Sequence, residues 1–572
     1  MIVGHPSRAV AVAEAPLLAA GAPLMDHAAF ALATQVWAEL RRRTVARSGP
    51  RPGARAAERQ VVLLVGSGNN GGDALLAGAR LARRGVRVTA LAVGPRVHDR
   101  GAVTLRRAGG RVRRVGEDGT TVQDAVRVAL AADVVLDAIL GIGGLPDRPG
   151  LRGVAAEVVR ALGGATGAGA TGEGTVARPT VVAVDLPSGV GADDGRVPDP
   201  SAVLAADVTV TFGAVKTGLL LPPAAGYAGR LVLVELGLGL DPHPVPTAAV
   251  PAATVPATSV SDVVRRLEPA DLVPLGLLSP PAAAAHKYTR GVLGVVAGTD
   301  EFPGAAVLAT SGASATGVGM IRYVGPAAVA HTVLAAHPEV VTTEGRVQAW
   351  AVGPGLPAVP GDDLEPRTPS IGPGEVSPRE HARRAVAEAC GSPGSGLAEA
   401  RVPVPAVVDA GGLALLPVRV PASVVVTPHA GELARLLRRR GHDVERADVE
   451  AEPLRWARTA HEETGATVLL KGAVTVVVGP GTVYAQDDAT PWLATAGAGD
   501  VLTGVLGALL AADADRVLDD PDGAAAVAAT AALVHGLAAR RASSGGPLTA
   551  TDVARAVPAT VASLLGVGGW RA

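Results

Sequence analysis

The sequence predicts an α/β protein with two domains, and three observations support this prediction. Short aliphatic runs, such as Val61–Val65 and Val181–Val184, alternate with stretches of helical periodicity, a pattern typical of buried parallel strands joined by crossover helices. The pattern stops at residues 241–260, which are rich in Pro, Ala and Thr, and then starts again. The length of 572 residues is enough for about two to four domains of ordinary size. We therefore expect an α/β domain over residues 1–240, a linker over 241–260, and a second α/β domain over 261–572.

Each domain contains a series of apolar runs that we expect to be strands. In the first domain they are Val61–Val65, Val86–Val93, Val134–Leu136, Val181–Val184, Val208–Phe212 and Leu231–Leu236. In the second they are Val292–Ala297, Met320–Val324, Ala349–Val352, Ala406–Val408, Ser423–Val426 and Val468–Leu470. Residues 357–405 are irregular and indicate a surface insertion with one helix near Pro378–Ala389. The Ala-rich stretch Ala524–Ala539 predicts a buried helix rather than a membrane span.

Composition favours a protein that acts on small molecules. Hydrophobic residues make up 48% and charged residues 18% of the chain, which excludes general disorder. The formal net charge of −1 provides no basic field for nucleic acid. The single cysteine, Cys390, excludes an internal disulfide and a cysteine-rich metal site, as expected in a reducing cytoplasm. The start of the chain carries Glu14 where a signal peptide would be apolar. We expect a cytoplasmic protein with neither a nucleic-acid nor a membrane partner.

Two residue types are scarce, and this scarcity selects positions of interest. Among 52 basic residues the only lysines are Lys216, Lys287 and Lys471, and the only asparagines are Asn69 and Asn70. A coding bias toward Arg leaves Lys mainly where a compact ammonium group is needed instead of a planar guanidinium. Chance survival is the alternative for each of the five.

The first candidate site begins directly after the strand Val61–Val65, at residues 66–73 (GSGNNGGD), and a helical stretch follows. This arrangement contains G-x-G-x-x-G between a strand and a helix, so backbone N–H groups could hold a phosphate or a dinucleotide. The next strand ends at Val93-Gly94-Pro95 without an acid for a ribose hydroxyl, which argues against an ordinary NAD-dependent dehydrogenase.

Oxygen-bearing side chains follow two further strands of the first domain. Asp137 ends one strand, and Asp185 and Ser188 follow another. Because the carboxyl ends of parallel strands meet at one edge of a sheet, these side chains and Asn70 could share a site. Such oxygen ligands suit a hard cation. The alternative is that the two aspartates only cap turns.

Four motifs of the first domain occur together in a specific order: NNGGD, DAILGIGG, VDLPSG and ADVTVTFGAVKTGLL. Over about Pro16–Leu240 they resemble the NAD(P)H-hydrate epimerase domain, which implies a Rossmann-like three-layer fold. The resemblance implies that potassium is held by Asn70, Asp137 and Ser188 and that Asp185 is catalytic. It also implies that the hydrated nicotinamide nucleotide is contacted by Asn69, Asn70, Gly71, Gly72, Asp73, Gly141, Ile142, Gly143, Gly144, Leu145, Pro146, Asp147 and Asp185.

Two features of this domain leave questions open. Lys216 lies in the motif FGAVKTGL, where an ammonium group could meet a substrate phosphate or a structural carboxylate. The early helix reads Met25-Asp26-His27-Ala28-Ala29 where the family usually has Met-Glu-x-Ala-Gly. The packing of this helix is therefore in doubt, although Asp26 preserves the acid.

The second candidate site is centred on the segment Gly497-Ala498-Gly499-Asp500, which precedes an apolar helix. Glycines at a helix start can direct N–H donors toward an anion, and Asp500 could take a proton from a hydroxyl that attacks a phosphoryl group. Lys471, between two apolar strands, is a natural counter-charge for nucleotide phosphates. His429, Asp409 and the segment Gly353–Leu356 also follow strands and complete the same pattern.

The motifs HKYTRG, PGAAVLATSGASATGVG, VGPGLP, VVDAGGLALL, VVTPHAGELARLL, LLKGAVT and TAGAGDVLTGVLGAL occur in this order in the second domain. Over about Val260–Leu565 they resemble the ADP-dependent NAD(P)H-hydrate dehydratase of the ribokinase-like superfamily. The resemblance implies Mg²⁺ bound with ADP or ATP, and substrate contacts from Ala305, Gly355, His429 and Asp500. The ADP contacts that it implies are Lys471, Gly472, Ala473, Val474, Thr475 and Gly499.

The two resemblances predict a bifunctional enzyme that repairs hydrated NADH and NADPH. Hydration leaves a hydroxyl group, a poor leaving group, on the dihydronicotinamide ring. Phosphorylation of this hydroxyl makes it leave easily, with Asp500 as the base, and ADP or ATP becomes AMP or ADP. The epimerase supplies the epimer that the dehydratase accepts. We also expect a homo-oligomer of unspecified size. The alternatives are a ribokinase-like kinase for a vitamin precursor and a first domain that only binds and has lost catalysis.

Overall fold

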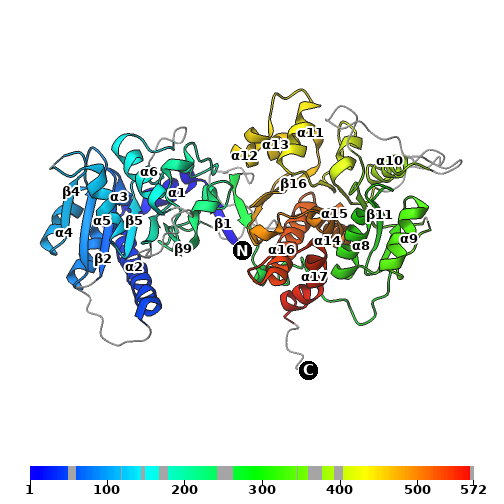
Figure 1. Ribbon diagram of the computed structural model, residues 1–572, viewed down its shortest axis with the longest axis horizontal. Coiled ribbons are helices and arrows are strands. Elements are labelled where there is room, and N and C mark those ends of the chain that lie inside the picture. Colours follow the sequence, from blue (N-terminus) through cyan, green and yellow to red (C-terminus); the bar gives the residue numbers. More distant parts are fainter. Residues whose placement is uncertain are drawn as a thin grey trace. The chain divides into compact units, whose positions relative to one another are not determined.

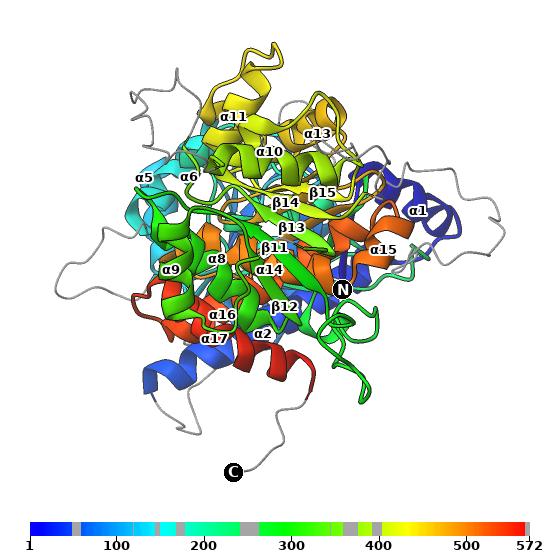
Figure 2. The same cartoon turned by 90° about the vertical axis from the view of Figure 1, so that its right-hand side faces the viewer.

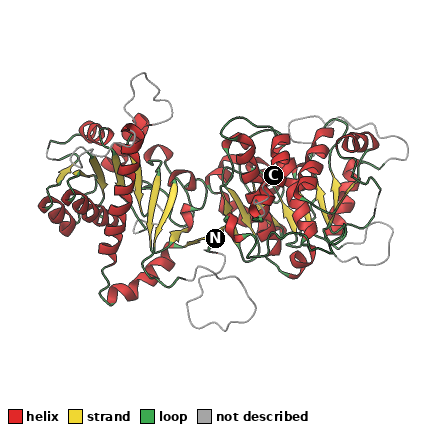
Figure 3. Cartoon of the chain, turned by 90° about the horizontal axis from the view of Figure 1, so that it is seen from below, coloured by secondary structure: helices red, strands yellow, loops and turns green. Residues whose placement is uncertain are grey.

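The chain forms two compact units, one of residues Val3–Val263 and one of Val264–Ala572 together with Met1–Ile2. A computed structural model describes residues 1–48, 59–117, 119–142, 149–166, 178–240, 262–343, 345–357, 376–391 and 403–566. The expected linker 241–260 and most of the expected insertion 357–405 lie outside these ranges. Figure 3 shows strands between layers of helices in each unit, so the predicted α/β class is confirmed.

The first unit is built on a seven-stranded parallel sheet with the order β4-β3-β2-β5-β6-β7-β9 (Figure 1). Its strands are β2 (Gln60–Val65), β3 (Arg87–Ala92), β4 (Arg111–Arg114), β5 (Val134–Ala138), β6 (Thr180–Val184), β7 (Val208–Phe212) and β9 (Arg230–Val234). The helices are α1 (Ser7–Ala19), α2 (Leu24–Ser48), α3 (Asn69–Arg83), α4 (Asp99–Arg107), α5 (Val122–Leu130), α6 (Gly153–Thr166) and α7 (Ala225–Ala228). A short strand β1 (Ile2–His5) pairs with β8 (Val215–Lys216).

The three layers of this unit follow from the alternation of side chains along each strand. On β2, Val61, Leu63 and Val65 pack in one core with α2, α3 and α4. Val62 and Leu64 point to the other face and pack with α5 and α6. Both faces of the strand are thus buried, which explains why β2 reads as an uninterrupted aliphatic run.

The sheet of the second unit runs in the order β12-β11-β13-β14-β15-β16-β17-β18-β10, and Figure 2 shows its first five strands side by side. Its strands are β10 (Val264–Arg266), β11 (Val292–Val296), β12 (Met320–Tyr323), β13 (Ala349–Val352), β14 (Ala406–Val408), β15 (Val424–Val426), β16 (Thr467–Leu470), β17 (Thr475–Val478) and β18 (Val483–Gln486). The sheet is parallel from β12 to β16, and β17 is antiparallel to both β16 and β18. The N-terminal ammonium of Met1 bonds to Asp271 at 2.6 Å and to Glu268 at 3.1 Å.

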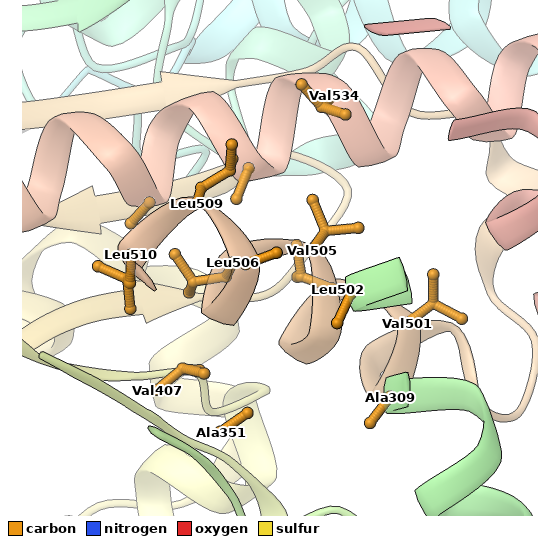
Figure 4. Close-up of a cluster of buried hydrophobic side chains, with 14 of the residues drawn as sticks. Ala309, Ala351, Val407, Val501, Leu502, Val505, Leu506, Leu509, Leu510 and Val534 are labelled. Atoms are coloured by element: carbon orange, nitrogen blue, oxygen red, sulfur yellow. The ribbon is translucent and has the colours of Figure 1, made fainter. Parts of the chain in front are cut away.

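Helices flank this sheet, and one of them lies at the centre of the core. They are α8 (Pro303–Thr316), α9 (Ala327–Ala336), α10 (Pro378–Ala389), α11 (Ala430–Arg438), α12 (Arg446–Ala451), α13 (Pro453–Thr464), α14 (Ala498–Ala512), α15 (Ala514–Asp519), α16 (Gly523–Ser543) and α17 (Ala550–Leu564). Figure 4 shows α14 with Val501, Val505 and Leu509 in a cluster that also contains Val534 of α16. Because α14 is buried on nearly all sides, its first turn is held in a fixed position relative to the strand ends.

Helix α16 is long and apolar enough to cross a bilayer, and 78% of its apolar window is buried within the structure. That burial agrees with the prediction of a core helix over Ala524–Ala539. Helices α1 and α2 pass the same test only if joined, and they are bent by 115° with respect to each other. The helix expected in the insertion is also confirmed, because α10 spans Pro378–Ala389.

Candidate functional site

The first candidate site lies where β2, β5 and β6 end. The segment after β2 turns at Gly66, where an added Cβ would collide with the backbone of Ile139, and α3 then begins at Asn69. Asn69, Asn70, Gly71, Gly72 and Asp73 therefore lie in the first residues of α3, whereas the sequence placed them before the helix. Several backbone N–H groups have no partner within the helix at such a start, so this turn is suited to an anion.

Asn70, Asp137 and Ser188 all lie at this site. Ser188 contacts Asp137 directly, and Asn70 contacts the last residue of β6. The amide nitrogen of Asn70 donates to the carbonyl oxygen of Val184 at 2.7 Å, and Oδ2 of Asp137 accepts from the backbone N–H of Ser188 at 2.8 Å. Asp137 is only 1% exposed, and its Oδ1 atom is buried without a hydrogen-bond partner. Burial raises the pKa of Asp137. An unpaired buried carboxylate oxygen in a site that also contains an amide and a hydroxyl group is of the kind that could hold a potassium ion.

Asp185 forms a buried ion pair with Lys216. Of the two partners that the motif allowed for Lys216, a substrate phosphate or a structural carboxylate, the structure shows the carboxylate. The ammonium group of Lys216 donates to Oδ1 of Asp185 and to the carbonyl oxygen of Phe212, the latter at 2.8 Å. Lys216 is 1% exposed, and Asp185 adopts a φ of +71° that L-residues rarely use. Lys216 thus meets a carboxylate of its own chain rather than standing free for a phosphate.

A second carboxylate of the first site carries an unpaired oxygen. Asp73 is 6% exposed, and its Oδ1 atom is buried without a partner. Burial raises the pKa of Asp73 to about 8, and the negative charges of Asp185 and Glu14 add to the increase. Burial also raises the pKa of Glu14 on α1, with Lys216 acting in the opposite direction. The sequence analysis missed Glu14 as a site residue, although an acid in the apolar stretch AVAVAEAPLLA was a possible signal.

The segment after β5 is described only in part. Gly141 packs against the side chain of Asn70, where an added Cβ would collide with the amide. Ile142 is the last described residue of this segment, and Gly143, Gly144, Leu145, Pro146 and Asp147 lie outside the described residues. Their expected contacts with the substrate remain a prediction.

The second candidate site surrounds the first turn of α14. Gly497, with a φ of +83°, is the N-cap residue of this helix, and Ala498, Gly499 and Asp500 form its first residues. The pKa of Asp500 is raised to about 7, mainly by burial and also by the negative charges of Asp409 and Glu432, while Lys471 acts in the opposite direction. A carboxylate with this pKa can exchange a proton near neutral pH, which suits a general base.

Lys471 and Asp409 form an ion pair beside this turn. The Nζ atom of Lys471 lies 2.7 Å from Oδ1 of Asp409 and 3.8 Å from Oε2 of Glu432. Burial alone would lower the pKa of Lys471, but Asp409, Glu432 and Asp500 together raise it. The sequence placed Lys471 at the nucleotide phosphates; in the structure its partners are carboxylates. Glu432 and Thr503 were not predicted as site residues, and the polar Thr503 in an apolar helix was the available signal.

The remaining predicted residues of the second site occupy three places. His429 caps α11 by accepting N–H bonds from Gly431 and Glu432, and burial lowers its pKa. Gly355 lies against Ala305, because a Cβ added to Gly355 would be 2.8 Å from that of Ala305. The segment Gly472, Ala473 and Val474 forms the turn between β16 and β17, Thr475 begins β17, and the two residues Gly472 and Ala473 are exposed.

Comparisons with known proteins match each unit separately and the whole chain together. Residues 21–218 match the family "YjeF-related protein N-terminus", and residues 293–364 and 397–558 match the family "NAD(P)H-hydrate dehydratase". The bifunctional NAD(P)H-hydrate repair enzyme Nnr of Mycobacterium tuberculosis is 37% identical over 518 residues, which is 88% of each chain. The NAD(P)H-hydrate epimerase of Clavibacter michiganensis is 47% identical over 239 residues, covering 42% of this chain and 92% of that protein.

Among solved structures, the chain is similar to the ADP/ATP-dependent NAD(P)H-hydrate dehydratase of Bacillus subtilis, co-crystallised with ATP and Mg²⁺. The identity is 25% and the TM-score 0.39, and the match covers 50% of this chain and 94% of that one.

Proposed function

Because this chain belongs to the family of bifunctional NAD(P)H-hydrate repair enzymes, we propose an assignment of its residues to the two reactions of the repair. The first unit epimerises hydrated NADH and NADPH, and the second dehydrates one epimer at the expense of ADP or ATP. The two α/β units occupy the parts of the chain for which the sequence predicts a Rossmann-like and a ribokinase-like fold. The single observation that supports the dehydration mechanism best is the position of Asp500, a partly buried carboxylate with a raised pKa, in the first turn of α14.

In the dehydration, Asp500 takes the proton from the ring hydroxyl of the substrate. The hydroxyl oxygen then forms a bond to the terminal phosphorus of the nucleotide, while the bond from that phosphorus to its bridging oxygen breaks. N–H groups of residues 497–499 stabilise the transferring phosphoryl group. In the final step phosphate leaves with its C–O bond pair, the neighbouring ring carbon loses a proton, and the ring double bond is restored.

Mg²⁺ would enter this site with the nucleotide. Within the described ranges, no group of three or more His, Cys, Asp or Glu side chains is arranged to hold a metal ion. The nucleotide phosphates would therefore provide most of its ligands, and the ion would neutralise charge that develops on them.

In the epimerisation, the carbon that carries the hydroxyl group is inverted, so its C–O bond must break and form again on the opposite face. We assign Asp73 as the group that gives a proton to the departing oxygen, because its raised pKa keeps it protonated near neutral pH. Asp185, fixed by Lys216, is the second acid–base group. Potassium at Asn70, Asp137 and Ser188 would supply a positive charge near the substrate phosphates.

Incubation with hydrated NADH and ADP or ATP tests the assignment of the second unit. The wild-type enzyme should restore NADH absorbance and release AMP or ADP, and Asp500→Asn should lower this rate by about 10²–10⁴-fold with epimerisation intact. The wild-type rate should fall as the pH drops below about 7, because the base form of Asp500 is then lost. A stable phosphorylated product would instead identify a kinase, and wild-type turnover by Asp500→Asn would refute the assignment.

Replacement of potassium tests the cation site. With tetramethylammonium salts at equal ionic strength, epimerisation should slow while dehydration continues, because the proposed ligands belong to the first unit. Added potassium should restore the rate. Equal epimerisation rates in the two salts would contradict the potassium site without affecting the rest of the proposal.

A further inference from the structure

Asp409 lies at the end of β14 and uses both carboxylate oxygens for contacts within the protein. Its Oδ1 accepts from Nζ of Lys471 at 2.7 Å, and its Oδ2 accepts from the hydroxyl of Thr503 at 2.9 Å. The side chain is 2% exposed. Because this carboxylate is buried and each of its oxygens already binds a protein group, we expect it to affect the reaction through those partners rather than by touching the substrate.

The first partner, Thr503, belongs to the helix that carries Asp500. Thr503 is three positions after Asp500, so the two residues are neighbours on one face of α14. Thr503 is completely buried in an otherwise apolar stretch of this helix. The bond from Thr503 to Asp409 therefore fixes the rotation of α14 about its axis relative to the end of β14.

The second partner, Lys471, lies directly beside the first turn of α14. A Cβ added to Gly499 would be 3.4 Å from Nζ of Lys471 and 3.8 Å from Oδ2 of Asp409. The backbone of Lys471 is fixed as well, because its N–H donates to the carbonyl oxygen of Pro428 at 2.8 Å. Asp409 thus holds a positive charge next to the N–H groups that would face the transferred phosphoryl group.

We propose that Asp409 is a positioning residue for dehydration, which orients Asp500 through Thr503 and holds the ammonium group of Lys471 against the start of α14 at residues 497–499. The proposal rests on the dehydratase function of the second unit. A stabilising role alone explains the contacts less well, because the cost of burying an ion pair offsets most of its attraction.

The charged groups around Asp500 make the proposal testable by pH dependence. Asp409, Lys471 and Glu432 are the charges that act on Asp500. His535 of α16 is buried near this turn and stays neutral, because burial lowers its pKa to about 4. Removal of the Asp409 charge should therefore lower the pKa of Asp500, whereas removal of the Thr503 hydroxyl changes no charge.

The experiment compares Asp409→Asn, Thr503→Val and Thr503→Ser in the full-length enzyme, with kcat for dehydration measured against pH. We expect Asp409→Asn to lower kcat about 10–100-fold and to move the acidic limb of the profile to lower pH. Thr503→Val should lower kcat without moving the acidic limb of the pH profile, and Thr503→Ser should keep kcat close to the wild-type value. Epimerisation by the same chains should equal that of the wild type.

Thr530→Val is the matched control, since this buried threonine of α16 bonds only to a carbonyl of its own helix; it should leave kcat unchanged. A wild-type kcat and an unshifted limb in Asp409→Asn would overturn the proposal. If Asp409→Asn does not fold, the test rests on Thr503→Val. A kcat of Thr503→Val equal to that of Thr503→Ser would then overturn the proposal. Absence of dehydration in the wild type would refute the proposed function instead.

Discussion

At the scale of single residues, the two sites share one arrangement although they belong to different folds. In each, a lysine pairs with a buried aspartate that follows a strand: Lys216 with Asp185, and Lys471 with Asp409. In each, a further aspartate has a raised pKa, about 8 for Asp73 and about 7 for Asp500. Lys287 differs, because its ammonium group lies 5.2 Å from the ring centre of Tyr288. Two of the three lysines thus stand where a compact cation meets a buried carboxylate.

We predict that Asp73→Asn stabilises the first unit as the pH rises while it lowers the epimerisation rate. The folded pKa of Asp73 lies above its unfolded value of 3.8, so its contribution to stability is present below that value and is lost as the pH rises toward about 8. The difference in Tm between variant and wild type should therefore grow from about pH 5 to about pH 8. Thermal unfolding at both pH values measures it.

Asp124→Asn is the control for this prediction, because the pKa of Asp124 is shifted in the opposite direction to that of Asp73. The exposed Asp124 has its pKa lowered by hydrogen bonds from Thr121 and Arg127, so its contribution to stability is present at neutral pH and is lost in acid. A Tm difference for Asp73→Asn that does not change with pH would show that this side chain is not protonated in the fold.

At the scale of elements, two glycines allow α8 and α14 to approach closely. A Cβ at Gly504 of α14 would collide with the carbonyl oxygen of Ala309, and one at Gly312 of α8 with that of Val501. The first turn of α8 carries Ala305, and that of α14 carries Asp500. Backbone contact between these helices therefore sets the distance between two residues of the proposed substrate site.

We predict that Gly504→Ala lowers the stability of the second unit by about 1–3 kcal/mol, the usual effect of overpacking, and reduces dehydration but not epimerisation. Gly507→Ala on the same helix is the matched control, because its Cβ would meet only side-chain carbons, at 3.0 Å on Leu293 and 3.2 Å on Ala351. Thermal unfolding compares the two variants. Equal losses would mean that the contact with the Ala309 backbone has no special role.

At the scale of the whole molecule, each reaction has its residues within one unit. The proposed epimerase residues all lie in Val3–Val263, and the proposed dehydratase residues all lie in Val264–Ala572. A substitution in one site should therefore leave the other reaction intact. An intermediate released from one chain should also be usable by another.

We predict that two variants, each defective in one of the two reactions, complement each other in a mixture. Asp185→Asn alone should dehydrate only the epimer that the second unit accepts, and Asp500→Asn alone should restore no NADH. Together they should convert both epimers, as measured by NADH absorbance and chromatography of the remaining substrate. If each variant is active in its remaining reaction but the mixture does not convert both epimers, the substrate must pass between the two sites of one chain.

The positions of the elements and of most site residues followed from local pattern. The strand β7 was predicted at Val208–Phe212 and observed there, because a strand buried on both faces reads as a continuous apolar run. A helix at each glycine-rich segment was predicted from glycines next to polar residues, since a phosphate-binding turn needs close backbone approach. The helix α3 begins earlier than predicted, at Asn69 within the segment. Glu14 was not predicted as a site residue, because α1 carries no motif around it.

The sequence by itself determined the α/β class, a helix after each glycine-rich segment, and the strand ends that carry Asp137, Asp185 and Asp409. Only the tertiary structure decided that Lys216 pairs with Asp185 and that Asp409 joins Lys471 to Thr503. Strand and helix ends depend on neighbouring residues, whose spacing is visible in the sequence. The partners of Asp409 lie 62 and 94 residues away, and they meet because the strand order and the packing of α14 on the sheet bring them together.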